Sequence, residues 1–82
     1  MYTIEFSEVA RKQLLKLSKE LQKRIIASLE RIRIRPEAYV KKLVGDPGYR
    51  LRVGDYRVII DLQKEKFVIL VIKIGHRKNV YK

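Results

Sequence analysis

Residues 49–62 read YRLRVGDYRVIIDL, in which two segments of alternating apolar and polar residues flank a Gly-Asp pair. Alternation with a period of two is typical of half-buried β-strands. A two-residue connection that contains glycine closes a tight hairpin, because glycine readily adopts the positive φ that such a turn needs. The stretch therefore predicts two antiparallel strands joined at Gly54 and Asp55.

This hairpin also predicts which residues lie opposite each other. With the turn at Gly54 and Asp55, Val53 faces Tyr56, and Arg52 faces Arg57 on the neighbouring strand. The two faces of the hairpin then differ sharply in character. The residues expected to pack under helices are Tyr49, Leu51, Val53, Val58 and Ile60, and those expected on the opposite face are Arg50, Arg52 and Arg57.

The three arginines are interpreted as an anion site. Like charges directly opposite each other destabilise a sheet by a few tenths of a kcal/mol up to ~1 kcal/mol. A cluster that accepts this repulsion indicates an anionic ligand, and the planar guanidinium grips phosphate oxygens in pairs. The alternative is that Arg50, Arg52 and Arg57 are solvated charges on the outside of a basic protein.

The remaining elements are predicted from helical spacing, caps and turn residues. Residues 3–6 form a short strand, and Ser7 caps a helix that is broken and restarted at Ser18 and stopped by Pro36. A turn follows at residues 46–49, with positive φ expected at Gly48. Residues 67–74 are apolar at nearly every position and are expected to form a central strand covered on both sides.

These elements predict one α+β domain over residues 1–82. Two N-terminal helices should pack on one face of a small, twisted, largely antiparallel four-stranded sheet, in the order β-α-α-β-β-β. The 20 Lys and Arg outnumber the 9 Asp and Glu, giving a net charge of +11, while 46% hydrophobic residues are enough for a folded core. The absence of cysteine excludes disulfides and Cys-ligated zinc, and no metal or other cofactor is expected.

The longest apolar run, residues 67–72, is too short to span a bilayer. The N-terminus does not resemble a secretory signal, so a cytoplasmic protein is expected.

A second group of functional candidates follows the last predicted strand. Gly75 precedes the only histidine, His76, and another arginine, Arg77, and Tyr81 comes four residues later. Together these side chains supply proton transfer, stabilisation of negative charge and a ring on which a base can stack. The alternatives are a surface histidine and a tyrosine that only anchors the C-terminus by packing.

Residues 49–58, the Ile74-Gly75-His76-Arg77 segment and the final Val80-Tyr81 resemble the RelE/ParE superfamily of toxins over essentially the whole chain. The resemblance implies the same fold and an mRNA interferase that enters the ribosomal A site. There the 2′-hydroxyl of the message would attack the adjacent phosphorus without a metal, leaving a 2′,3′-cyclic phosphate and a 5′-hydroxyl. It also implies a RelB-like antitoxin that binds the toxin and holds it inactive.

The resemblance also implies roles for individual residues. Arg50 and Arg52 correspond to a pair of basic residues that are lysines in well-studied RelE toxins, where one is proposed as the general base. Because arginine does not lose its proton in proteins, both are expected to bind phosphate. The expected catalytic residues are Arg52, Arg57, His76, Arg77 and Tyr81, with His76 as the leading candidate for the base.

Two other functions remain open. A ParE-like toxin would inhibit DNA gyrase by binding it, without cleaving nucleic acid, and fold alone does not separate it from an interferase. The combination of Arg57, Arg77 and Tyr81 favours the nuclease, because a protein-binding inhibitor needs no convergent phosphate site. A plain nucleic-acid-binding module would bind RNA with a steep salt dependence and would cleave none.

Overall fold

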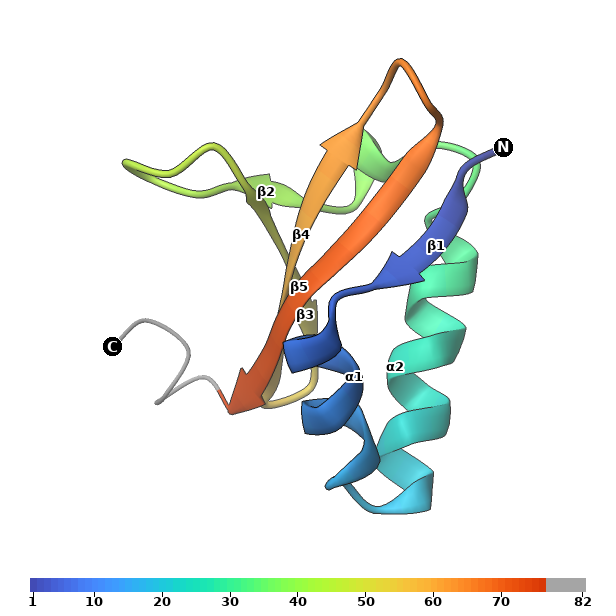
Figure 1. The fold of residues 1–82 in the computed structure, drawn as a ribbon, viewed down its shortest axis with the longest axis vertical. Helices are drawn as coiled ribbons and strands as arrows, with labels where there is room; N and C mark the ends of the chain where they lie inside the picture. Colours follow the sequence, from blue (N-terminus) through green and yellow to red (C-terminus); the bar gives the residue numbers. More distant parts are fainter. Residues whose placement is uncertain (77–82) are drawn as a thin grey trace.

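Two helices and one five-stranded sheet make up the computed structural model, which describes residues 1–76 (Figure 1). The elements in chain order are β1 (Thr3–Phe6), α1 (Glu8–Leu15), α2 (Lys19–Arg31), the 3-10 helix η1 (Pro36–Ala38), β2 (Lys41–Lys42), β3 (Tyr49–Val53), β4 (Tyr56–Gln63) and β5 (Val68–His76). The strand order in the sheet is β1-β5-β4-β3-β2. The β1–β5 pair is parallel and the other pairs are antiparallel. The α+β class and the largely antiparallel sheet are therefore confirmed.

The predicted number of four strands is wrong, because β2 was missed. Lys41 pairs with Arg50 and Lys42 with Tyr49, which adds a short edge strand beside β3. The connection is closed by the Leu43 N–H, which donates to the Gly48 carbonyl at 3.0 Å. Two consecutive lysines show no alternation, so this strand exists only through its pairing with β3.

Serine caps divide the helical region as predicted. The Ser7 Oγ accepts from the Ala10 N–H at 3.0 Å, and the Ser18 Oγ accepts from the Leu21 N–H at 3.2 Å. Each cap satisfies an N–H that has no partner within its helix. The chain therefore leaves α1 and enters α2 in a new direction.

Among the described residues, none of the helices is long and apolar enough to cross a membrane.

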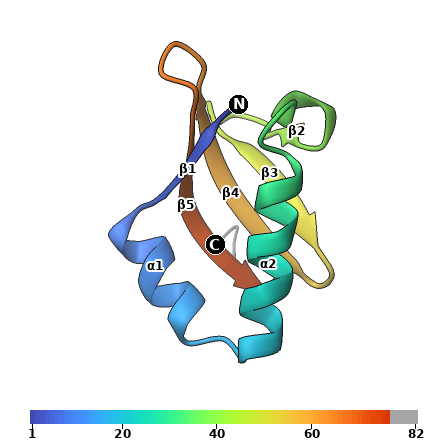
Figure 2. The same cartoon turned by 90° about the vertical axis from the view of Figure 1, so that its right-hand side faces the viewer.

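Both helices lie on the same face of the sheet (Figure 2). The core between the two layers contains fully buried side chains from α2 and from the central strands, including Ile25, Leu29, Ile32, Val58, Ile60, Ile69 and Val71. Helices cover β5 on one side only, so the expectation of cover on both sides is wrong. Leu70 and Ile72 are half-buried instead of buried, and we call the side without helices the open face.

The predicted register of the β3–β4 hairpin is confirmed. Val53 pairs with Tyr56 and Arg52 with Arg57, and Gly54 takes a φ of 59° in the turn. The expected positive φ at Gly48 is wrong. Glycine is needed at Gly48 for space, because a Cβ there would lie 3.1 Å from the Ile60 carbonyl oxygen.

A β-bulge interrupts the β4–β5 ladder. Ile60 pairs with Val71 but Ile59 pairs with Lys73, which leaves Ile72 as the extra residue. Helix α1 satisfies the backbone here, since the Ser7 hydroxyl donates to the Ile72 carbonyl at 2.8 Å and the Ile74 N–H donates to the Gln13 Oε1 at 2.7 Å. The bulge allows Val71 and Ile74 to face the core on the same side of the strand.

A cationic hollow on the open face of the sheet

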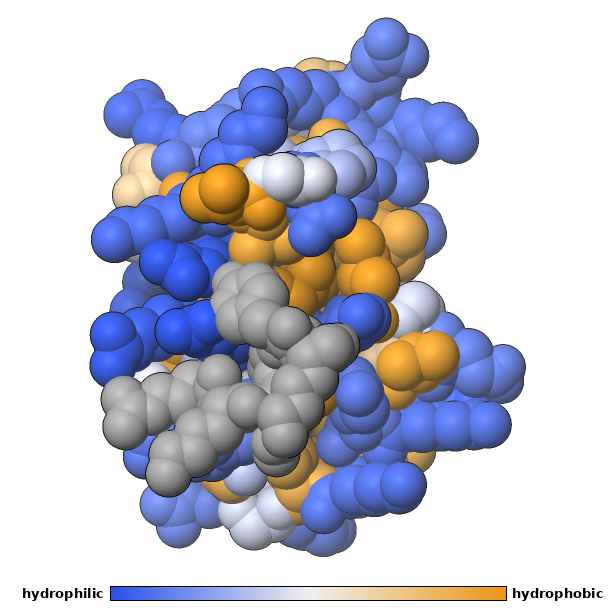
Figure 3. Space-filling model, turned by 90° about the vertical axis from the view of Figure 1, so that its left-hand side faces the viewer, coloured by the Kyte–Doolittle hydropathy of each residue, from blue (hydrophilic) through white to orange (hydrophobic). Residues whose placement is uncertain are grey.

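Five side chains line a hollow of about 120 Å³ on the open face. They come from three strands and from the residue that ends η1, and they are Tyr39, Lys41, Arg50, Arg52 and Arg57. We call this feature the cationic hollow. Figure 3, which views the open face, shows strongly hydrophilic side chains beside a band of hydrophobic ones.

Strand pairing brings the four cations together. Lys41 and Arg50 are direct neighbours across β2 and β3, and Arg52 and Arg57 are direct neighbours across β3 and β4. Arg50 and Arg52 are two residues apart on β3 and therefore lie on the same face. Because the strands hold their backbones, the four cationic groups converge on one place without the ordering cost that a loop would add.

The electrostatics of the hollow favour an anion. Its lining, drawn from the described residues, has four cationic side chains and no acidic one. Beside the turn, the Arg52 Nε–H donates to the Gly54 carbonyl at 3.4 Å. A concave surface of one charge sign, on a chain of net charge +11, raises the local concentration of anions. Guanidinium and ammonium groups together match the oxygens of a phosphodiester.

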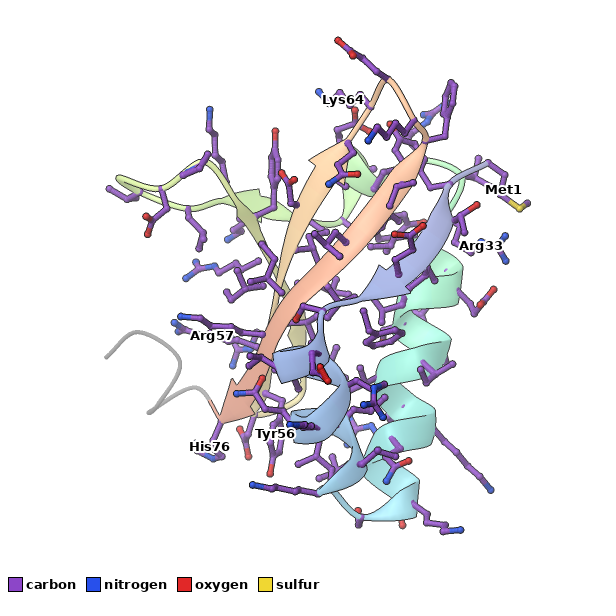
Figure 4. All side chains as sticks on the ribbon, in the orientation of Figure 1. Met1, Arg33, Tyr56, Arg57, Lys64 and His76 are labelled. Carbon is purple, nitrogen blue, oxygen red and sulfur yellow. The ribbon has the colours of Figure 1, made fainter. Side chains whose placement is uncertain are left out.

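His76 does not join this hollow. It pairs with Tyr56, and the two rings make an edge contact with centroids 5.6 Å apart. The residue before it, Gly75, pairs with Arg57. The register therefore puts His76 on the helix side of the sheet with Tyr56, and Arg57 on the open face. Figure 4 shows the Arg57 side chain pointing away from the two helices, and His76 at the end of β5 near Tyr56.

The structure describes three of the other predicted site residues and not the remaining two. Arg50, Arg52 and Arg57 share the open face, as the alternation predicts. Arg77 and Tyr81 lie outside the described residues. Within residues 1–76, the side chains of His, Asp and Glu form no group of three or more that could hold a metal ion.

Sequence reasoning missed two residues of the hollow, Tyr39 and Lys41. Neither belongs to an alternating segment, and residues 43–48 separate β2 from β3 in the chain. The only signal in the sequence was the predicted turn at residues 46–49, after Pro36. It favours a connection that folds back onto the following strand. Their place in the hollow depends on the pairing of Lys41 with Arg50, which two lysines do not reveal.

Comparison with known proteins identifies the chain as a toxin of the RelE/ParE type. The family model of the ParE toxin of type II toxin-antitoxin systems matches residues 4–81, and the chain belongs to this family. The chain is also similar to the mRNA interferase toxin RelE of Escherichia coli K12. The two are 30% identical over 81 residues, which is 95% of this chain and 85% of the relative.

Solved structures agree with this assignment. The isolated E. coli RelE toxin superimposes with a TM-score of 0.80 at 30% identity, covering 93% of this chain and 84% of that one. The toxin in the archaeal RelE-RelB complex from Pyrococcus horikoshii gives 0.76 at 27% identity, covering 96% and 98%. The RelBE2 complex from Mycobacterium tuberculosis gives 0.84 at 23% identity over 93% and 98%, a likeness of fold.

Proposed function

We propose that this protein is the toxin of a type II toxin-antitoxin system and that it cleaves mRNA in the ribosomal A site. The observation that carries the proposal is the convergence of four cationic side chains on one hollow of a rigid sheet. The similar E. coli protein is named an mRNA interferase, and the hollow offers the chemistry that phosphodiester cleavage needs.

In the proposed reaction the message supplies its own nucleophile. The 2′-oxygen forms a bond to the adjacent phosphorus and loses its proton to a base, and the bond from phosphorus to the 5′-oxygen breaks as that oxygen gains a proton. The products are a 2′,3′-cyclic phosphate and a 5′-hydroxyl. Negative charge accumulates on the phosphorane-like transition state, and Arg52 and Arg57, with Arg50 and Lys41 beside them, stabilise it.

The base has two candidates that differ in position. His76 has a side chain suited to proton transfer, but its strand register sets it on the helix side of the sheet. Lys41 lies in the hollow, and unlike its three arginine neighbours it carries an amine that can exchange a proton. Arg77 and Tyr81, by the resemblance to RelE, contribute charge stabilisation and base stacking. Separate His76→Ala and Lys41→Ala variants, each followed by a pH–rate profile, distinguish the two candidates.

A RelB-like antitoxin is the proposed partner. Several of the similar solved structures are complexes of RelE with RelB, from E. coli, P. horikoshii and Methanococcus jannaschii. A partner with acidic side chains over the cationic hollow would neutralise its charge and exclude the message. The proposal also places the protein in the cytoplasm, where the ribosomes are.

Inhibition of DNA gyrase by protein binding is the second candidate function. It is favoured by the family model, whose description names the ParE toxin. The two functions make different demands on the cationic hollow, because only the nuclease needs all of its cations to converge on one phosphate.

The test is cleavage of a defined message on translating ribosomes, mapped by primer extension. Arg52→Ala and Arg57→Ala are compared with Arg31→Ala, which removes one exposed cation from the last turn of α2, away from the hollow. We expect codon-phased cuts that weaken at least tenfold in the first two variants and persist in the third. An intact message, together with growth arrest on expression, would refute the nuclease and favour inhibition of gyrase.

A further inference from the structure

Tyr39 is the one aromatic side chain, among the described residues, that lines the cationic hollow. It is 51% exposed, so its ring is available to a ligand. Other rings have places elsewhere in the fold: Tyr56 contacts His76, and Phe67 makes an edge contact with the buried Tyr2. An exposed ring beside four cations suits a ligand that has both a flat surface and a negative charge.

The backbone that carries Tyr39 is held on both sides. Its N–H donates to the Pro36 carbonyl at 3.0 Å, and Pro36 itself is fully buried. Glu37 forms an ion pair of 3.4 Å with Lys64 in the β4–β5 turn. The pKa of the Glu37 carboxyl is lowered, first by a hydrogen bond with its own backbone and then by Lys64, so the pair is charged at neutral pH. On the other side, two residues along the chain, Lys41 is paired into the sheet.

We infer that Tyr39 is a stacking surface for one nucleobase of the bound RNA, next to the phosphate held by Lys41 and the three arginines. The inference rests on the proposed function, since it names a substrate contact of the same site. A base and its own phosphate are separated only by the ribose, so one nucleotide can meet both the ring and the cations when they line the same hollow. Stacking accepts every base, because each has a π face, and its strength differs between bases.

This role differs from that of the cations. The cations fix the phosphate and carry no information about the base, as is general for phosphate contacts. The ring of Tyr39 contacts the base itself, so it holds one base beside the bound phosphate. Tyr39 is therefore a base-binding residue of the proposed nuclease.

The test measures binding of trinucleotides that cannot be cleaved because every 2′-hydroxyl is methylated. One base at a time is replaced by an abasic residue, and affinity is measured by fluorescence anisotropy at a fixed low salt concentration. For the natural protein we expect one abasic position to weaken binding by about 5- to 150-fold, the range for loss of one stacked base. Tyr39→Ala should lose the effect at that one abasic position, whatever effect another position keeps through Tyr81, and Tyr39→Phe should discriminate as the natural protein does.

Controls separate this inference from a loss of folding and from the proposed function. Ile34→Ala removes another exposed apolar side chain, 75% exposed, and should leave the discrimination unchanged. Thermal unfolding of each variant shows that it is folded. Two results overturn the stacking role of Tyr39 and leave the interferase standing. One is ribosomal cleavage with no effect of any abasic position, and the other is a Tyr39→Ala variant that keeps the natural protein's discrimination at every position. Discrimination without ribosomal cleavage supports stacking and refutes the interferase.

Binding of a short acidic peptide tests whether Tyr39 serves protein docking instead. If Tyr39→Ala weakens binding of the peptide and has no effect on the RNA series, Tyr39 serves protein docking, and the inference is wrong.

Discussion

Replacing Gln13 by alanine should destabilise the fold through one hydrogen bond at the β5 bulge. The Gln13 Oε1 accepts from the Ile74 N–H at 2.7 Å, across the gap between α1 and β5. Ile74 is only 3% exposed, so in Gln13→Ala water does not readily reach this N–H. Leaving a buried donor unsatisfied costs ~1–3 kcal/mol, whereas alanine returns at most a few tenths of a kcal/mol in helix propensity.

The loss is large enough to measure in a chain of this size. For a domain of 60–100 residues, 1 kcal/mol shifts the melting temperature by roughly 4–8 °C, so Gln13→Ala should lower it by roughly 4–24 °C. Gln13→Glu keeps a side-chain acceptor at the same length and should recover most of the loss. Gln22→Ala is the matched control. It removes a similar 2.9 Å bond to the carbonyl of Leu17, which lies between α1 and α2 and is half-buried where Ile74 is buried.

Thermal and urea unfolding measure the global effect, and amide hydrogen exchange measures the local one. The Ile74 amide should lose more protection than its neighbours in β5, because its acceptor is gone. A Gln13→Ala variant with natural stability and a fully protected Ile74 amide would show that the bulge is satisfied in another way and that this reasoning is wrong.

Three further predictions concern the hollow and its frame. Arg52→Thr removes one of two like charges that face each other, so it should stabilise the fold by a few tenths of a kcal/mol up to ~1 kcal/mol at low salt and weaken cleavage. Equal or lower stability in urea unfolding would contradict the expected repulsion. Lys41→Ala should reduce ribosomal cleavage at least tenfold, whereas Lys42→Ala, one residue along the same strand and outside the hollow, should not; equal losses would indicate general attraction to RNA. Gly48→Ala should destabilise by about 1 kcal/mol or more, because its methyl group would lie 3.1 Å from the Ile60 carbonyl oxygen, and a melting temperature that does not fall would mean that β3 can shift aside.

The elements that were predicted correctly are those whose information is local. Alternation and a glycine turn were enough to predict the pairing of Arg52 with Arg57, and two serines marked the starts of the helices. Strand β2 was missed because its two lysines become a strand only beside β3. The membership of Tyr39 in the hollow was missed for the same reason, since it depends on the pairing of β2 with β3 and not on a local pattern.

The position of His76 shows how one residue can change a site. In an unbroken strand that starts with Val71 facing the helices, every second residue would follow it, and His76 would lie on the open face with the arginines. The bulge at Ile72 inserts one residue and reverses this parity, so His76 lies beside Tyr56 instead. The sequence carries one sign of the bulge. Two apolar residues, Val71 and Ile74, are three positions apart, and Lys73 lies between them.

The same parity argument explains how the sheet tolerates four cations in one hollow. A shift of β3 and β4 by one residue would turn the arginines inward and expose four side chains that are now at most 6% exposed, Leu51, Val53, Val58 and Ile60. Burying each such side chain contributes ~1.5–3 kcal/mol, or ~6–12 kcal/mol for the four, against ~1 kcal/mol for a pair of opposed like charges. The core on the helix side therefore decides the register, and the open face can gather charges that would not stay together on a flexible loop. Because one face of the sheet stabilises the fold and the other carries the proposed site, substitutions in the hollow should change activity far more than folding.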